Sequence, residues 1–302
     1  MVEYKKFDQV VLWGHKLHSH THSYIHGAFV KAFEYLGYKT LWLDKTDDIS
    51  DINFKNNLFI TEGQVDEGIP IEQSSYYVIH NCNGEKYKPI PQNHKMVLQT
   101  YTYDADQRWK GTPIPNKTFE FYQGDGVWIP WATDLLPHEI DSNIELVKNN
   151  SIDIKNETHF IGMPIEPWDK FAEAVELKGI EYKRGGGFGN NISYEDNIKL
   201  IQSSIIAPAL QCEWQVKHGY IPCRIFKNIS YGKMGATNSP AVQKLFGDRL
   251  IYDSDIENLV DRLLEFELNS ENIPKKIELM EYVRDHHTYL NRIDTIMWFF
   301  SK

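Results

Sequence analysis

The sequence has few cysteines, no long apolar run and no surplus of basic residues. Cys82, Cys212 and Cys223 are odd in number and lack the close spacing of metal ligands, which favours free thiols in a reducing compartment. No apolar run reaches the length of a membrane span, and the N-terminal residues lack the apolar core of a signal peptide. We therefore expect a cytoplasmic protein without a transmembrane segment.

The charge balance argues against a general nucleic-acid binder. The formal net charge is -10, so the chain lacks the excess of lysine and arginine that would displace counterions from DNA or RNA. Any phosphate group must therefore be held by a local cluster of residues. The 8 tryptophans and 17 tyrosines supply flat faces that suit sugars and nucleobases as well as a core. A length of 302 residues is comfortable for two α/β domains.

The first half of the chain alternates strand and helix patterns. Residues 9–13 form a short apolar run, residues 24–36 repeat apolar side chains at helical spacing, and residues 38–43 are apolar again. This is a β-α-β unit, whose right-handed crossover puts its first loop at the carboxyl end of the sheet, where open α/β sheets bind ligands. Further strands are expected at 58–61, 76–82 and 96–101.

The loop after the first strand is rich in histidine, with His15, His18, His20 and His22. Alternating histidines can ligate zinc, but no cysteine or carboxylate lies nearby in the sequence to complete the coordination, so we expect no metal. The alternative is hydrogen bonding to a polyhydroxylated ligand, with His18, His20 and Thr21 as acceptor-binding residues. Plain capping of the following helix is an equally open interpretation.

The loop after the third strand carries Glu62, Gln64 and Asp66. A carboxylate held near a hydroxyl can take its proton, so this loop is a candidate source of a general base. Asp66 is our first candidate for that base, with Glu62 and His22 as alternatives, and Gln64 is a candidate contact to the acceptor sugar. A solvated acidic loop without catalytic function is the other interpretation.

The second half repeats the alternation of strands and helices. A charged, asparagine-rich stretch at 143–157 is interpreted as a linker, which predicts domains at 1–145 and 146–280, followed by a C-terminal helix at 281–302. The contiguous glycines at 185–187 do not fit the spacing of a dinucleotide fingerprint, so we expect no cofactor. Strands are expected at 158–162, 180–184, 203–210 and 250–252, and helices at 167–178, 256–266 and 274–300.

The segment from Tyr220 to Ser239 carries the strongest functional signal. Pro222 suits the first turn of a helix and Gly232 its end, while Arg224 and Lys227 lie three residues apart on one face. A helix N-terminus offers free N–H groups and positive potential, so two added cations make this segment a candidate holder of a diphosphate. A buried helix with merely solvated cations is the alternative.

This segment resembles the second half of glycosyltransferases of the GT-B architecture, in particular the group 1 type found in spore-coat CgeB-like proteins. The N-terminal half is similar to glycosyltransferases encoded by large DNA viruses, which would place the protein in the host cytoplasm. The residues that carry the resemblance are Arg224-Ile-Phe226 with Gly232, Thr237-Asn-Ser239, Tyr252-Asp253, His287-Thr-Tyr289 with Arg292, Trp13-Gly-His15 and Phe59-Ile-Thr-Glu62-Gly-Gln-Val-Asp66.

The resemblance implies an α/β fold of GT-B type, with two Rossmann-like domains facing a central cleft. The first domain would bind the acceptor, the second would bind a nucleoside-diphosphate sugar such as a UDP- or GDP-sugar, and the C-terminal helix would pack back on the first. The partners would be the nucleotide sugar and a glycan acceptor. The donor contacts implied for this chain are Gly162, Arg184, Arg224, Lys227, Asn228, Ser230, Thr237, Asn238 and Ser239.

One departure from the family pattern bears on mechanism. Retaining relatives of glycogen synthase carry two glutamates separated by seven residues, whereas this chain has Gly219 and Lys227 there. We therefore expect an inverting, metal-independent transferase, in which Arg224 and Lys227 stabilise the leaving diphosphate. The viral resemblance suggests a xylosyltransferase. A glycan-binding module without catalysis and a nucleotide-sugar epimerase of the same fold are the alternatives, and the sequence leaves the nucleobase, the acceptor and the oligomeric state open.

Overall fold

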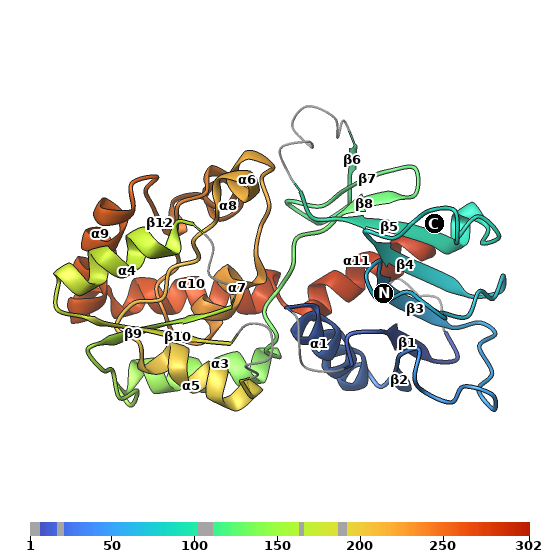
Figure 1. The fold of residues 1–302 in the computed structure, drawn as a ribbon, viewed down its shortest axis with the longest axis horizontal. Helices are drawn as coiled ribbons and strands as arrows, with labels where there is room; N and C mark the ends of the chain where they lie inside the picture. Colours follow the sequence, from blue (N-terminus) through green and yellow to red (C-terminus); the bar gives the residue numbers. More distant parts are fainter. Residues whose placement is uncertain (1–6, 17–20, 102–110, 163–165, 187–191) are drawn as a thin grey trace. The chain divides into compact units, whose positions relative to one another are not determined.

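The computed structural model describes residues 7–16, 21–101, 111–162, 166–186 and 192–302 (Figure 1). Contacts divide the chain into two compact units. Among the described residues, unit 1 contains 7–100, 111–130 and Tyr289–Lys302, and unit 2 contains Tyr101 and 131–288. The chain therefore enters unit 2 after Pro130 and returns to unit 1 after Thr288, whereas the sequence-based domain limits are 145/146 and 280/281.

Unit 1 is built around one eight-stranded sheet with the order β2-β1-β3-β4-β5-β8-β7-β6. The first six strands in this order, β2, β1, β3, β4, β5 and β8, pair in parallel. The last two, β7 and β6, pair antiparallel and form one edge of the sheet. Its elements are β1 (Val10–Trp13), α1 (Thr21–Tyr35), β2 (Thr40–Leu43), β3 (Leu58–Glu62), β4 (Tyr76–His80), β5 (Lys95–Gln99), β6 (Thr112–Pro113), β7 (Phe121–Gln123), β8 (Gly126–Trp128) and α11 (Tyr289–Phe300), with a 3-10 turn at Gln92–His94.

The central strands of unit 1 are buried along their whole length. Every residue of β1, β3 and β4 is buried, as expected for parallel strands covered on both faces. The core on one face contains Trp13, Phe59, Tyr77 and Tyr87, and the rings of Phe59 and Tyr77 stack 4.8 Å apart. Because these strands are buried at every position, they appear in the sequence as short, mostly apolar runs and could be predicted from them.

The last helix, α11, belongs to unit 1 and packs against α1. The ring of Tyr289 lies 4.5 Å from that of Phe29, and Phe300 lies 5.2 Å from Tyr76. A buried ion pair adds a polar contact, because Arg292 Nη1 donates to Glu120 Oε1 at 2.9 Å. Residues far apart in the sequence thus share one core.

Unit 2 contains two short parallel ladders that an extended segment connects. β9 pairs with β10, and β11 pairs with β12. Between them, Ile205 N donates to Glu157 O at 2.8 Å and Ala209 N donates to Ala236 O at 2.8 Å. Residues 204–210 therefore join the two ladders, although only Ala209 forms a recognised bridge, with Thr237. The predicted strand at 203–210 is present as this connecting segment rather than as a regular strand.

Helices surround these ladders. The elements of unit 2 are α3 (Pro137–Lys148), β9 (Glu157–Ile161), α4 (Trp168–Leu177), β10 (Glu181–Gly185), α5 (Tyr194–Ser203), α6 (Glu213–Lys217), α7 (Cys223–Ser230), β11 (Ala236–Thr237), α8 (Pro240–Phe246), β12 (Ile251–Tyr252), α9 (Ile256–Leu268) and α10 (Ile273–His286), with 3-10 turns at Gly247–Arg249 and Ser270–Asn272. Side chains cap two of these helices, because Ser193 accepts from Asp196 N at the start of α5 and Asp255 accepts from Asn258 N at the start of α9.

One expectation was wrong. The stretch interpreted as a solvated linker begins inside α3, whose Ile140, Ile144 and Val147 are buried on one face, so this helix is part of unit 2. The region expected to be helical at 274–300 is helical, but it forms two helices, α10 and α11, which are separated at His287 and Thr288, where the chain changes units. Among the described residues, no helix has both the length and the apolar character needed to cross a bilayer.

Candidate functional site

The loops that follow β1 and β3 bring two functional residues of unit 1 together. Gly14 has φ +86, and a side chain there would meet Val65 at 2.2 Å, so the chain can turn sharply only with glycine. The next residue, His15, also has a left-handed backbone, with φ +54. This turn places His15 Nε2 3.1 Å from Glu62 Oε2, although the two residues are 47 positions apart.

Glu62 ends β3 and is held as a buried carboxylate. Its Oε2 accepts hydrogen bonds from His15 and, at 3.0 Å, from the Gln64 amide. Burial raises the pKa of the Glu62 carboxyl, but these hydrogen bonds outweigh burial and hold the pKa below its usual value. Glu62 is therefore ionised at neutral pH and available as a proton acceptor or a ligand.

Three more histidines surround this pair. His22, in the first turn of α1, stacks on His15 with ring centroids 5.1 Å apart, and it lies 5.7 Å from the ring of His80. His26 approaches His15 edge-on at 5.3 Å. Burial lowers the pKa of His26 to about 4 and also lowers the pKa of His80. His26 is therefore neutral at neutral pH.

Three side chains of this group converge. One ring nitrogen each from His15 and His22 and one carboxylate oxygen of Glu62 lie within 4.8 Å of one another.

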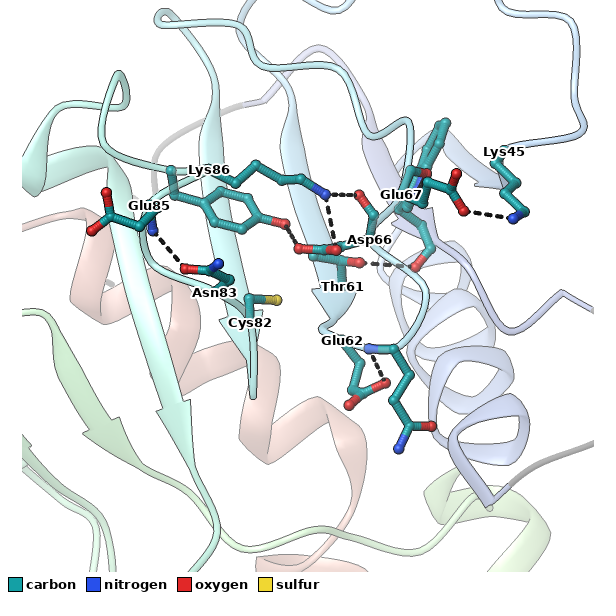
Figure 2. Close-up of polar contacts among 12 residues, drawn as sticks. Lys45, Thr61, Glu62, Asp66, Glu67, Cys82, Asn83, Glu85 and Lys86 are labelled. Atoms are coloured by element: carbon teal, nitrogen blue, oxygen red, sulfur yellow. Dashed lines mark hydrogen bonds and ion pairs between the residues drawn. The ribbon is translucent and has the colours of Figure 1, made fainter.

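Asp66 lies apart from this cluster and is tied into its own network. Lys86 Nζ lies 2.9 Å from Asp66 Oδ1, and the Tyr87 hydroxyl donates to Oδ2 at 2.9 Å. Figure 2 shows the carboxylate of Glu62 pointing away from the Asp66–Lys86 pair. The role of Asp66 as a base stays a prediction, and both of its oxygens already carry a hydrogen bond.

The remaining acceptor-binding predictions fall partly outside this description. His18 and His20 lie outside the described residues, as does the side chain of Thr21. Gln64 is exposed, and its backbone amide rather than its side chain contacts Glu62. Sequence reasoning did not assign a role to His15, since its contact with Glu62 depends on the pairing of β1 with β3.

Arg224 is the central residue of the candidate donor site in unit 2. It lies in the first turn of α7, and its Nη2 donates to Ile161 O at 3.1 Å. The guanidinium carbon lies 4.7 Å from the ring centre of Phe160 and 5.2 Å from that of Trp168. Burial lowers the pKa of Arg224 below its usual value. No carboxylate in the described part of the chain forms an ion pair with this cation.

Gly162 lies against the guanidinium. Its φ is +139, and a side chain at this position would meet Arg224 Nη2 at 2.9 Å. The backbone conformation requires glycine here, directly after β9, and the missing side chain leaves room for the guanidinium. Arg184, which precedes the last residue of the neighbouring strand β10, is exposed. The sequence pointed to Gly162 and Arg184 but gave no signal for Phe160 and Trp168, which hold Arg224 from the side.

Lys227, the second predicted cation, has an internal partner. Its Nζ lies 3.1 Å from Asp134 Oδ2, and both groups are buried. The Tyr231 hydroxyl donates to the same carboxylate and lies 2.7 Å from Asp134 Oδ1 and 2.8 Å from Asp134 Oδ2. The positive charge of Lys227 is thus already balanced within unit 2.

Most of the other predicted donor contacts take part in internal hydrogen bonds. Asn228 donates to Ala207 O at 2.8 Å, the Ser230 and Thr133 hydroxyls lie 2.6 Å apart, and Thr237 donates to Ala209 O at 3.0 Å.

Asn238 and Ser239 follow β11 and contribute differently. The Asn238 side chain both accepts from Gln211 N and donates to Gln211 O, each at 2.9 Å. Ser239 Oγ and Gln211 Oε1 are buried without a hydrogen-bond partner in the described residues. Buried polar atoms of this kind are satisfied by water or a ligand, so this edge of unit 2 has unfilled hydrogen-bonding capacity.

Comparison with known proteins identifies the architecture. No protein-family profile matches the chain, and no curated protein matches it. Solved structures do match. An α,α-trehalose-phosphate synthase (UDP-forming) from Burkholderia xenovorans, in complex with glucose-6-phosphate, is similar with a TM-score of 0.51 and 9% identity, over 93% of this chain and 78% of that one. The chain has the GT-B fold.

Two further structures have lower scores. A UDP-forming α,α-trehalose-phosphate synthase from Burkholderia xenovorans has a TM-score of 0.46 and 6% identity, covering 93% of this chain and 79% of that one. An alpha1,3-fucosyltransferase has a TM-score of 0.46 and 11% identity, covering 92% and 82%. The predicted α/β fold class of GT-B type is confirmed by the architecture and by the likeness to the trehalose-phosphate synthase with a TM-score of 0.51.

Proposed function

We propose that this GT-B protein is a glycosyltransferase that moves a sugar from a nucleoside-diphosphate sugar to a hydroxyl group of a glycan. The observation that carries the proposal is Arg224, a partly buried cation in the first turn of α7 with no carboxylate partner among the described residues. A guanidinium beside a helix N-terminus matches the oxygens of a diphosphate in geometry and charge. Unit 2 would hold the donor through this group.

Arg224 would also assist the chemistry. When the glycosidic bond of the donor breaks, negative charge develops on the leaving diphosphate, and a preorganised cation stabilises that charge. Phe160 and Trp168 pack against the guanidinium and the Ile161 carbonyl accepts its hydrogen bond, so the cation would need little reorganisation during the reaction. Neutralisation by Arg224 would make the transfer independent of a metal ion on the diphosphate. Lys227 would contribute only through its pair with Asp134.

The base that takes the proton of the acceptor hydroxyl would come from unit 1. Glu62 is the strongest of the three candidates because it is ionised and ends a strand of the parallel sheet, and His22 lies beside it. Asp66 is third, since Lys86 and Tyr87 occupy both of its oxygens. Direct attack by the activated hydroxyl would invert the anomeric configuration, in line with the loss of the paired glutamates at Gly219 and Lys227.

The similar trehalose-phosphate synthase gives a starting point for the choice of donors to test. Because that protein is described as UDP-forming, UDP-sugars are the first donors to test, followed by GDP-sugars. The finer resemblance to CgeB-like and viral glycosyltransferases adds UDP-xylose to this set. A glycan hydroxyl is the proposed acceptor.

The experiment combines binding and turnover. Calorimetry with UDP and GDP on the full chain should show binding to the wild type, at least about tenfold weaker binding to Arg224→Ala, and unchanged binding to Arg284→Ala, an arginine paired with Asp141 and Asp285. Equal affinity in both variants would refute the role of Arg224. Release of the nucleoside diphosphate with formation of a glycoside is the expected turnover, and formation of a free epimer, or no turnover with any donor, would refute the proposed reaction.

The base is tested separately. Glu62→Gln should reduce transfer by about 100-fold or more without weakening nucleotide binding, because loss of a general base typically costs about 10²- to 10⁴-fold. Asp66→Asn serves as the comparison. A normal rate in Glu62→Gln together with loss of transfer in Asp66→Asn would assign the base to Asp66.

A further inference from the structure

We propose that His15, His22 and Glu62 form a binding site for one Zn²⁺ ion in unit 1. Two imidazoles and one carboxylate, with a water molecule in the fourth position, are a ligand set that Zn²⁺ uses in proteins. The candidate ligand atoms of the three residues lie within 4.8 Å of one another. His15 Nε2 and Glu62 Oε2 are 3.1 Å apart, close to the roughly 3.3 Å expected for two ligands of a tetrahedral ion with bonds of about 2.0 Å.

The three ligands lie on or next to separate elements, two of which are neighbouring strands of the sheet. His15 follows β1, Glu62 ends β3, and His22 lies in the first turn of α1. Because Trp13 pairs with Thr61 in the parallel ladder, the residues after these two positions emerge side by side. A metal site assembled from a sheet edge and a helix start needs little rearrangement to form.

Additional contacts orient the ligands. The carbonyl oxygen of Gly14 lies 3.0 Å from His26 Nδ1 and accepts a hydrogen bond from Trp42 Nε1 at 2.9 Å, which fixes the left-handed turn that presents His15. The Gln64 amide donates to Glu62 Oε2. Outer contacts of this kind set the orientation of metal ligands and contribute to affinity.

A simple hydrogen bond between His15 and Glu62 would explain less of this arrangement. Such a pair requires one histidine, whereas the stacked ring of His22 presents a second nitrogen to the same point. The left-handed turn at Gly14 and His15 packs closely against Val65 and brings His15 to Glu62. The convergence of two imidazoles on one carboxylate is accounted for by a common ion.

Zinc binding would affect the proposed transfer reaction. A carboxylate that ligates Zn²⁺ is a much weaker base, because the ion stabilises its negative charge, so it accepts a proton from the acceptor hydroxyl poorly. If Glu62 is the base, bound zinc should therefore inhibit transfer, and a chelator should restore it. This consequence depends on the proposed function, whereas the binding of zinc does not.

The site is tested by titrating Zn²⁺ into the full chain after removal of metal with a chelator, with calorimetry as the readout. The wild type should bind one Zn²⁺ ion. His22→Ala and Glu62→Gln should each bind Zn²⁺ at least about 100-fold more weakly, since loss of a contact that only orients a ligand already lowers metal affinity by about 10- to 100-fold. His94→Ala, which removes another histidine of unit 1, should bind as the wild type does. Co²⁺ should give the intense visible absorption of a tetrahedral site in the wild type and in His94→Ala only.

The outcomes separate the two proposals. Equal binding of zinc by the wild type, His22→Ala and Glu62→Gln would overturn the site, as would no binding by a wild type that is folded by circular dichroism. Should Glu62→Gln fail to fold, His22→Ala decides. Zinc binding at this site without inhibition of transfer would leave the metal site in place and remove Glu62 as the base.

Discussion

The ammonium group of Lys227 lies 3.1 Å from the carboxylate of Asp134, and both groups are buried within unit 2. Tyr231 donates its hydroxyl to the same carboxylate, and the shared negative charge contributes to raising the pKa of that hydroxyl after the larger effect of burial. The helix that carries Arg224 is thus anchored from its inner face by charge as well as by packing. A buried pair of this kind makes the helix sensitive to loss of either partner.

Asp134→Asn should destabilise the protein strongly. The substitution leaves Lys227 buried without its counter-charge, which typically costs about 3–5 kcal/mol. Urea denaturation followed by circular dichroism measures this loss. Glu145→Gln is the matched control, because it breaks the exposed pair between Glu145 Oε1 and Lys148 Nζ, which are 2.8 Å apart, and should change stability little. Equal costs in both variants would contradict the buried pairing.

Gly162→Ala should weaken binding of nucleoside diphosphates. The substitution would strain the backbone, whose φ is +139, and its added methyl group would meet Arg224 Nη2 at 2.9 Å, which together would move the guanidinium from its place over Phe160. We expect at least about tenfold weaker binding of UDP by calorimetry, the size of one charge-assisted hydrogen bond. Gly179→Ala is the control, since Gly179 also has a left-handed backbone, with φ +74, but has no neighbouring atom within 4 Å of the added methyl. Similar weakening in both variants would mean that backbone strain alone is responsible.

Lys233 should make stability depend on pH at alkaline values. Burial lowers the pKa of Lys233 from 10.5 to about 8, so between these values the unfolded chain binds more protons than the folded one. The cost of burying the charge is full below pH 8 and is relieved as pH rises to 10.5, by about 3 kcal/mol in total. The stability of the wild type relative to Lys233→Met, measured by urea denaturation, should therefore increase across this range. A constant difference would refute the lowered pKa.

Removal of residues 289–302 should unfold unit 1. The truncation deletes α11 and exposes Phe29, Tyr76 and the buried carboxylate of Glu120. A decrease in the near-ultraviolet circular dichroism signal and rapid proteolysis of the N-terminal half are the expected results. Deletion of Lys302 alone is the control and should leave both unchanged. A truncated chain whose N-terminal half stays resistant would show that α11 is dispensable for unit 1.

The sequence was sufficient to predict the alternating α/β pattern, because buried parallel strands and amphipathic helices leave local signals. It predicted β1, β3 and β4 within a few residues, since every position of these strands is apolar or enclosed. The edge strands β6 and β7 were missed because they are short and partly exposed. The helix α3 was missed because its charged outer face masks three buried residues.

The site was predicted less completely, since its contacts are not local. The pattern singled out Arg224 and Gly162, but not the rings of Phe160 and Trp168, whose role depends on the end of β9 meeting α4 and α7. The absence of a carboxylate near the histidine loop argued against a metal. That argument considered neighbours in sequence only, whereas the sheet brings Glu62 to His15.

The placement of α11 has a consequence for biosynthesis. Because α11 completes the core of unit 1, the residues of β1 to β8 are synthesised first and must wait for residues 289–302. Unit 2 has no such requirement, since nearly all of it is contiguous in the sequence. On the ribosome, unit 2 can therefore reach its native state before unit 1, and the N-terminal part of unit 1 keeps apolar surface exposed until α11 has emerged.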